Sequence, residues 1–250
     1  MFKPKTEKIK MLGGLFPERV SELESILIGK TKVYIDYANV RPWSYKLKWN
    51  VDIVRVKQFF DSFDSVESVR LYHGLLEGDS RSEEENKKFI KHYGLDYITK
   101  KVKILKKSID VSSISKNSPD ILKNFIRNSL LLELKIQTIE LLNDELRILN
   151  KRGVVYLEDR KCNFDVEIGM DMYMDLERNT CDCFILWSAD SDFAEPIEKI
   201  LEHGKKVYLF ATTGVVSREL SDLRQKGLKI YDIKKIRDFI CWKREISVSF

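Results

Sequence analysis

Cysteine and histidine are scarce in this sequence, whose 250 residues include four cysteines and three histidines. Cys181 and Cys183 form a C-x-C pair, but no second pair stands at the spacing of a zinc site and no histidine is near them in the sequence. We therefore expect buried thiols rather than a disulfide framework or a Cys/His metal site. Any metal or cofactor chemistry must then come from carboxylates.

Long apolar runs are also missing. No run approaches the roughly 18 to 20 residues that span a bilayer, and the basic N-terminus lacks the apolar centre of a secretory signal. We therefore expect a cytoplasmic protein that does not associate with membranes. Hydrophobic residues make up 43% of the chain, which excludes disorder as a global description. The length fits one large domain, or one domain that carries an insertion.

Hydrophobic periodicity predicts strands that alternate with helices over most of the chain. After a basic lead and a helix in residues 1–30, the pattern predicts strands at 33–35, 66–72 and 95–105, and helices at 51–60 and 80–93. Beyond residue 152 it predicts strands at 153–157, 183–187, 206–210 and 229–233, and helices at 165–176, 193–203 and 217–225. This order predicts an α/β fold with a mainly parallel sheet flanked by helices.

Residues 108–152 interrupt this alternation as a helical insertion. A polar linker leads to residues 119–152, which we predict to be one long helix with Ser118 as N-cap and Gly153 at its C-terminal stop. Its apolar stripe includes the polar residues Ser129 and Asn143, which weaken it as a coiled-coil seam. The stripe either packs on its own domain or contacts a second copy or a protein partner, and periodicity does not decide between these alternatives.

Acidic residues stand where the predicted strands end. Asp36 directly follows one strand, Asp190 and Asp192 follow another, and Asp165 opens a helix. Ligand sites of open parallel sheets lie outside the carboxyl ends of the strands, so Asp36, Asp190 and Asp192 can converge if their strands are neighbours. Carboxylates brought together need a compensating cation, and an oxygen-rich site suits Mg²⁺ or Mn²⁺. The alternative for Asp36 and for Asp192, each taken alone, is a helix N-cap.

Three sequence blocks contain these acids: Ile35–Asn39, Lys161–Val166 with Asp171 beyond, and Ser188–Phe193. Together, and in this order, they resemble the signature blocks of the NYN family of PIN-like ribonuclease domains, which includes the LabA-like proteins. The resemblance covers roughly residues 31–240, omits the insertion and leaves 241–250 as a tail. Lys161 stands one residue further from Asp165 than the family's spacing has it, and Ala189 replaces a family glycine.

The resemblance implies a PIN-like three-layer α/β/α sandwich, interrupted here by the helical insertion, and a metal-dependent ribonuclease. By position, Asp36, Asp165, Asp190 and Asp192 would be the catalytic residues and would bind Mg²⁺ or Mn²⁺. Asn39 would orient a metal-bound water or an acid, and Ser188 would support its loop. Asp171 also matches the family pattern. Because six residues of helix turn by about 600°, roughly 120° away from the face of Asp165, we interpret Asp171 as a supporting residue.

Basic and aromatic residues near these blocks are candidates for RNA binding: Lys101, Lys103, Arg160, Lys161 and Trp43, the last beside Tyr45 and Trp49. Lysine and arginine can bind backbone phosphates, and aromatic rings can stack on unpaired bases. The alternative for the lysines is a solvated edge strand, and for Trp43 and Trp49 it is core packing.

The leading hypothesis is a metal-dependent endoribonuclease that cleaves RNA phosphodiester bonds. The alternative is an RNA- or protein-binding regulatory module with a weak or vestigial nuclease site, which acts through the long helix. A metal-dependent phosphatase or nucleotidase is a third hypothesis. It is disfavoured because Ala38 stands where an aspartyl-phosphate enzyme has the second acid of a D-x-D motif.

Overall fold

The computed structural model describes residues 1–75, 80, 83–84, 87, 96–108, 117–119, 122–124, 126, 128–151, 156–161 and 163–241. The chain forms two compact units. The core unit comprises Met1–Lys101 and Cys162–Phe250, and the inserted unit comprises Val102–Lys161. Most of the helix predicted at 80–93, and nearly all of the tail at 241–250, lie outside the described residues. No described helix is long and apolar enough to cross a membrane.

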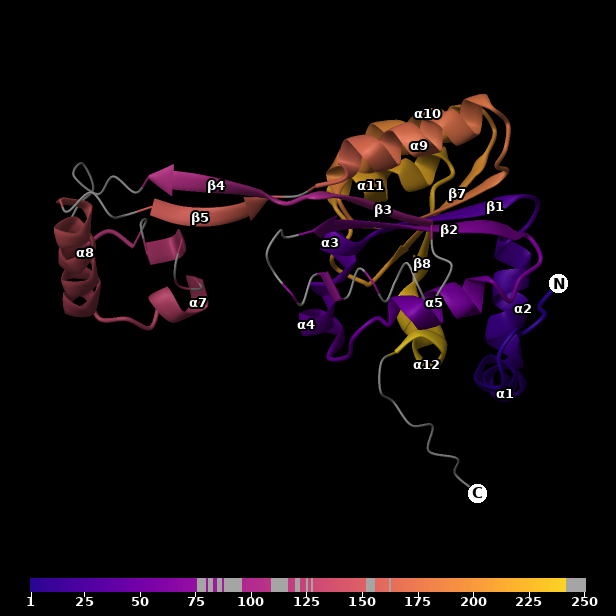
Figure 1. Ribbon diagram of the computed structural model, residues 1–250, viewed down its shortest axis with the longest axis horizontal. Helices are drawn as coiled ribbons and strands as arrows, with labels where there is room; N and C mark the ends of the chain where they lie inside the picture. Colours follow the sequence, from indigo (N-terminus) through magenta and orange to yellow (C-terminus); the bar gives the residue numbers. More distant parts are fainter. Residues whose placement is uncertain are drawn as a thin grey trace, which may run out of the picture. The chain divides into compact units, whose positions relative to one another are not determined.

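A six-stranded parallel sheet is the centre of the core unit (Figure 1). Its strands, in spatial order, are β3 (Asp96–Lys101), β2 (Val66–Leu75), β1 (Thr31–Asp36), β6 (Cys183–Trp187), β7 (Lys206–Ala211) and β8 (Lys229–Asp232). Every neighbouring pair is parallel. Strands β1 and β6 are buried along their whole length, as central strands covered on both faces are. The predicted α/β class with a parallel sheet is confirmed.

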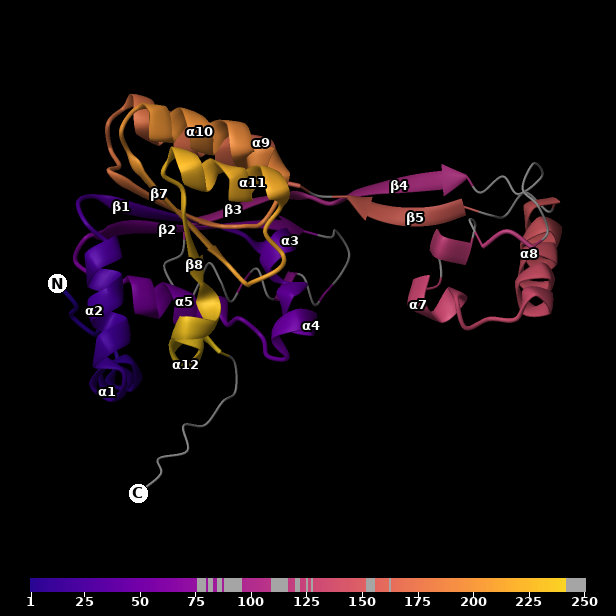
Figure 2. The same ribbon diagram turned by 180° about the vertical axis from the view of Figure 1, so that it is seen from behind.

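Helices cover both faces of this sheet, which gives the three layers of a sandwich (Figures 1 and 2). One face carries α9 (Asp165–Glu177) and α10 (Ala194–Glu202), and the other carries α1 (Glu7–Leu15), α2 (Pro17–Ile26), α5 (Ile53–Phe60) and α12 (Arg237–Ile240). Shorter elements complete the connections: α3 (Tyr37–Val40), α4 (Trp43–Leu47), α11 (Arg218–Asp222), η2 (Ser191–Phe193), η3 (Leu223–Lys226) and η4 (Ile233–Ile236).

Local sequence explains how the principal helices form and pack. In α9 the buried residues Ile168, Met172 and Leu176 recur every four positions, which places them on one face against the sheet. The side chain of Asp52 caps α5 by accepting hydrogen bonds from the second and third backbone N–H groups of that helix. Gly29 turns the chain from α2 into β1 with a φ of +69°, and a Cβ there would lie 2.9 Å from the carboxylate of Asp182.

The inserted unit contains an antiparallel pair of strands and several helical segments (Figure 1). The strands are β4 (Lys103–Ser108) and β5 (Tyr156–Lys161), and the helical segments are η1 (Leu122–Asn124), α7 (Asn128–Leu131) and α8 (Ile136–Lys151). Leu122, Leu131 and Ile139 are buried together and form a small core of its own.

The prediction of one helix over residues 119–152 is wrong. The chain turns after Leu131, where backbone hydrogen bonds join Glu133 to Leu130 and Leu134 to Leu131. Beyond the turn, α8 runs back along η1, and the side-chain amide of Asn143 donates to the carbonyl of Ser118 at 2.9 Å. Part of the predicted apolar stripe, including Leu122 and Ile139, is therefore buried within the inserted unit.

Two strand predictions also need correction. The run at 95–105 is not one strand, because it divides at Val102 into β3 of the parallel sheet and β4 of the inserted unit. The run at 153–157 does not resume the parallel sheet, because β5 at 156–161 pairs with β4 in antiparallel register. Central parallel strands are continuous apolar runs, whereas β4 and β5 are rich in charged residues, as suits a two-stranded ribbon.

Candidate active site

Asp36 is the most deeply buried carboxylate of the candidate site. It ends β1 and its residue is only 4% exposed. Its Oδ1 accepts a hydrogen bond from the backbone N–H of Asn39, and its Oδ2 accepts one from the hydroxyl of Ser188, both at 3.3 Å. Burial raises the pKa of Asp36 to about 6, with the charges of Asp165 and Asp190 acting in the same direction and the two hydrogen bonds opposing them.

The loop after β6 lies beside Asp36 because β6 is the neighbour of β1 in the sheet. In this loop, the backbone N–H of Asp190 donates to the Ser188 hydroxyl at 3.3 Å, and that of Asp192 donates to the Asp190 carboxylate at 3.2 Å. Asn39 spans the two loops, because its Oδ1 accepts a hydrogen bond from the backbone N–H of Ala189 at 3.0 Å. Residues of the first and third sequence blocks therefore hold each other in place.

Asp165 brings the second block to the same edge of the sheet. It is the first residue of α9, and the side-chain amide of Asn163 donates to its Oδ2 at 2.7 Å. Partial burial raises its pKa, and the negative charges of Asp190 and Asp192 raise it further. Asp36 and Asp165 thus each interact electrostatically with Asp190.

The donor set of these four aspartates fits a hard divalent cation. Oxygen ligands are those that Mg²⁺ and Mn²⁺ prefer, and a cation would relieve the repulsion that raises the pKa values of Asp36 and Asp165. Within the part of the chain that the structure describes, no three Asp, Glu, His or Cys residues are grouped closely enough to hold a metal ion. To hold one ion, the carboxylates would have to move closer together.

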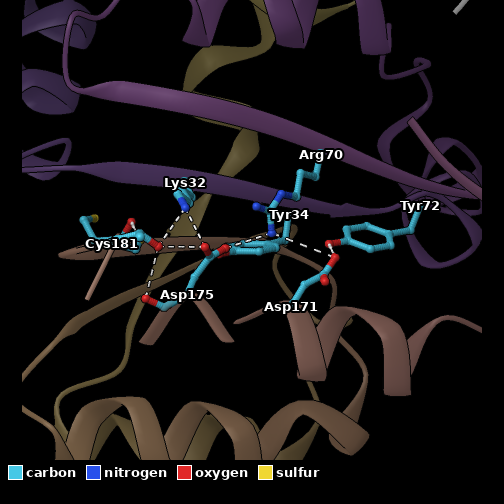
Figure 3. A network of polar contacts seen from close by, with 9 residues as sticks. Lys32, Tyr34, Arg70, Tyr72, Asp171, Asp175 and Cys181 are labelled. Atoms are coloured by element: carbon cyan, nitrogen blue, oxygen red, sulfur yellow. Dashed lines mark hydrogen bonds and ion pairs between the residues drawn. The ribbon is translucent and has the colours of Figure 1, made fainter. Parts of the chain in front are cut away.

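Asp171 contacts the sheet. Its Oδ2 accepts a hydrogen bond from the hydroxyl of Tyr72 at 2.6 Å and lies 3.9 Å from a guanidinium nitrogen of Arg70 (Figure 3). Tyr72 and Arg70 belong to β2, so Asp171 joins α9 to the strand beside β1. These contacts fit the interpretation of Asp171 as a supporting residue.

A second carboxylate of α9, Asp175, anchors the same helix more strongly. It accepts hydrogen bonds from Lys32 at 2.5 Å, Tyr34 at 2.7 Å, Arg70 at 2.8 Å and Thr180 at 2.8 Å (Figure 3). Burial raises the pKa of Asp175, but these partners outweigh it and hold the pKa below its usual value. Sequence reasoning missed this network. Its one signal in the sequence is a basic residue, Lys32, directly before the apolar run Val33–Ile35 of β1.

The residues predicted to bind RNA belong to different parts of the chain. Trp43 is 4% exposed and belongs to the hydrophobic core, so the prediction of a base-stacking role for it is wrong and core packing is what the structure has. Lys101 is exposed on β3, while Lys103, Arg160 and Lys161 belong to the inserted unit. There the register places Lys103 opposite Lys161.

Aromatic side chains are accessible elsewhere on the same segment. Tyr45 is 74% exposed and lines an open hollow of about 340 Å³ with Ser44, Lys48, Trp49 and Asn50. This hollow lies on the chain that follows Asn39.

Comparisons with known proteins show the family of this chain. The model of the NYN domain family matches residues 30–231, a range that includes all four aspartates. Low amplitude and bright protein LabA from Synechococcus elongatus is 31% identical over 81 residues, which are 32% of this chain and 41% of that protein. The match thus spans less than half of that relative. The crystal structure of a Vibrio parahaemolyticus protein of unknown function covers 86% of this chain and 96% of its own, with a TM-score of 0.47 and 15% identity.

Proposed function

Because the chain belongs to the NYN domain family, we propose that it is a metal-dependent endoribonuclease that hydrolyses phosphodiester bonds of RNA. The family is a PIN-like nuclease family, which suggests ribonuclease activity. The observation that carries the proposal is the group of electrostatically coupled aspartates around buried Asp36, at the carboxyl edge of a parallel sheet. The proposal includes a cytoplasmic location, which the free buried thiols of Cys181 and Cys183 support.

Asp36, Asp165, Asp190 and Asp192 would hold Mg²⁺ or Mn²⁺. The bound ion would supply a water that is activated near neutral pH and positive charge beside the scissile phosphate. Asp36 is largely ionised at pH 7, because its pKa lies near 6, so it can bind a cation there. Asn39 and Ser188 keep the loops after β1 and β6 in fixed relation, and the Asn39 side-chain amide can donate a hydrogen bond to a water or an acid.

The test is cleavage of a labelled single-stranded RNA and a matched DNA in Mn²⁺, Mg²⁺ or EDTA. We expect RNA cleavage that EDTA abolishes and that Asp190→Asn reduces by at least about 100-fold, because a ligand carboxylate is lost. A circular RNA of the same sequence should also be cut, since only an endonuclease can open it. The matched control is Asp64→Asn, an exposed acid just before β2, at the opposite edge of the sheet.

Retained metal-dependent cleavage in a folded Asp190→Asn variant would contradict the assignment of the site. Failure of folded wild type to cleave any substrate would favour the alternative function, an RNA- or protein-binding module with a vestigial site. Exposed apolar side chains of the inserted unit support that alternative: Leu132 is 88% exposed, Ile136 58% and Leu141 62%. Because the predicted long helix does not form, such a module would act through this folded unit.

A further inference from the structure

Lys100 lies on the face of the sheet that carries the acidic site. The parallel register aligns Asp36 with Tyr72, Tyr72 with Ile98, and Gly74 with Lys100. Alternate residues of a strand point to the same side, so Lys100 shares the side of Asp36 and Tyr72. That side is the one covered by α9, as the hydrogen bond from Tyr72 to Asp171 establishes. Lys101 points to the opposite side.

The side chain of Lys100 reaches the first turn of α9, beside Asp165. Its Nζ lies 2.7 and 2.8 Å from the two carboxylate oxygens of Glu167 and 4.7 Å from the centre of the Phe164 ring. Its positive charge is also among the influences on Asp165, where it opposes the neighbouring carboxylates. Lys100 is therefore a cation at the rim of the candidate active site. It belongs to β3, which pairs with the strand β2 that contains Tyr72.

The pair formed by Lys100 and Glu167 is open to solvent. The two side chains are 36% and 40% exposed, and ion pairs with this exposure contribute little to stability. A phosphate oxygen can therefore take the place of the Glu167 carboxylate at small cost. RNA that approaches four aspartates needs nearby cations, because its backbone and the site have charge of the same sign.

We propose that Lys100 binds a phosphate of the RNA backbone next to the scissile one, with Glu167 holding the ammonium group until RNA arrives. This inference rests on the proposed function, since it names a contact of the same site with the same substrate. The competing explanation is that Lys100 only fixes the start of α9 through Glu167. The two explanations differ in what the loss of Glu167 does to RNA binding.

The experiment measures binding of a fluorescent single-stranded RNA in EDTA, which prevents cleavage, across a range of KCl concentrations. Lys100→Gln should weaken binding by about tenfold and reduce the slope of log Kd against log salt by about 0.7, the value for one lost contact with a single strand. The matched control Lys206→Gln removes an exposed lysine at the amino end of β7, the end of the sheet opposite to Asp36, and should change both quantities much less. Glu167→Gln should bind RNA as well as wild type or more tightly.

Cleavage in Mn²⁺ gives an independent readout. Lys100→Gln should raise KM with little change in kcat, because a flanking phosphate is bound equally in the ground state and the transition state. Equal weakening by Lys100→Gln and Glu167→Gln would overturn the proposal in favour of a purely structural role. A Lys100→Gln variant that binds and cleaves RNA like the control Lys206→Gln, while wild type cleaves RNA, would also overturn the proposal but would leave the proposed function intact. If wild type neither binds nor cleaves RNA, both proposals fail.

Discussion

Replacing Asp36 with asparagine is expected to stabilise the folded protein while it removes the proposed activity. Burial, with the neighbouring carboxylates, raises the pKa of Asp36 from 3.8 to about 6, and the residue is only 4% exposed. Each unit of difference between the folded and unfolded pKa corresponds to about 1.4 kcal/mol. Keeping Asp36 ionised therefore costs the folded state about 3 kcal/mol at neutral pH.

This cost depends on pH in a defined direction. Below the unfolded pKa of about 3.9 the carboxyl is protonated in both states and costs nothing. Between that value and about 6 the folded protein retains a proton that the unfolded chain releases, so this group lowers stability progressively as pH rises. Above that window the cost is constant. The advantage of Asp36→Asn should therefore be small near pH 4 and reach its full size by pH 7.

The variant must also replace two hydrogen bonds. Its amide oxygen can accept from the backbone N–H of Asn39, and its NH₂ group then faces the Ser188 hydroxyl, which can accept. Allowing about 1 kcal/mol for imperfect replacement leaves a net gain of about 1 to 2 kcal/mol at pH 7. With a urea m-value of about 2 to 3 kcal/mol/M, the midpoint of unfolding should rise by roughly 0.5 M.

The assay is urea unfolding in EDTA at pH 4 and pH 7.5. Asp192→Asn is the matched control, because this exposed carboxylate should give little change. Mn²⁺ should raise the midpoint of wild type more than that of Asp36→Asn, since ligands stabilise the state that binds them. A variant less stable than wild type at pH 7.5, or a difference that is the same at both pH values, would refute the electrostatic reasoning.

The parallel sheet could be predicted because its strands are distinctive in sequence. Central strands such as β6 (Cys183–Trp187) are covered on both faces and so are apolar throughout. The closeness of Asp36 and Asp190 followed from the rule that strand ends meet at one edge, whereas Asp165, which opens α9, was grouped with them by the family resemblance. The first inference uses a pattern shorter than ten residues, and the second uses a general rule of sheet topology.

The network around Asp175 could not be predicted, because its partners are distant in sequence. Lys32 lies 143 residues from Asp175 and Arg70 lies 105 residues away, so no local spacing links them. The same limit applies to Lys100, whose sequence neighbours are also lysines. Only the register of β3 against β2 separates the side chain that faces α9 from the one that does not.

The inserted unit was mispredicted because helix propensity continues where the helix does not. Residues 119–152 contain few residues that break a helix, so local preference gave one long element. The folded unit instead buries Leu122, Leu131 and Ile139 against one another, which a straight helix cannot do. Tertiary burial thus overrides a weak local preference at the turn after Leu131.

Two further substitutions test the packing of the core unit. Asp175→Asn leaves Lys32 and Arg70 without their buried counter-charge, so it should destabilise the protein by about 3 kcal/mol in urea unfolding at pH 7. Because these partners hold the pKa of Asp175 below its usual value, the stabilisation is present above about pH 4 and lost below it, and the difference between variant and wild type should narrow there. Trp43→Ala should cost about 3 to 5 kcal/mol because the ring is buried, whereas Tyr45→Ala should change stability by less than about 0.5 kcal/mol and weaken binding of single-stranded RNA instead. A Trp43→Ala protein with wild-type stability and impaired RNA binding would reverse the assignment of the two rings and return Trp43 to the substrate surface.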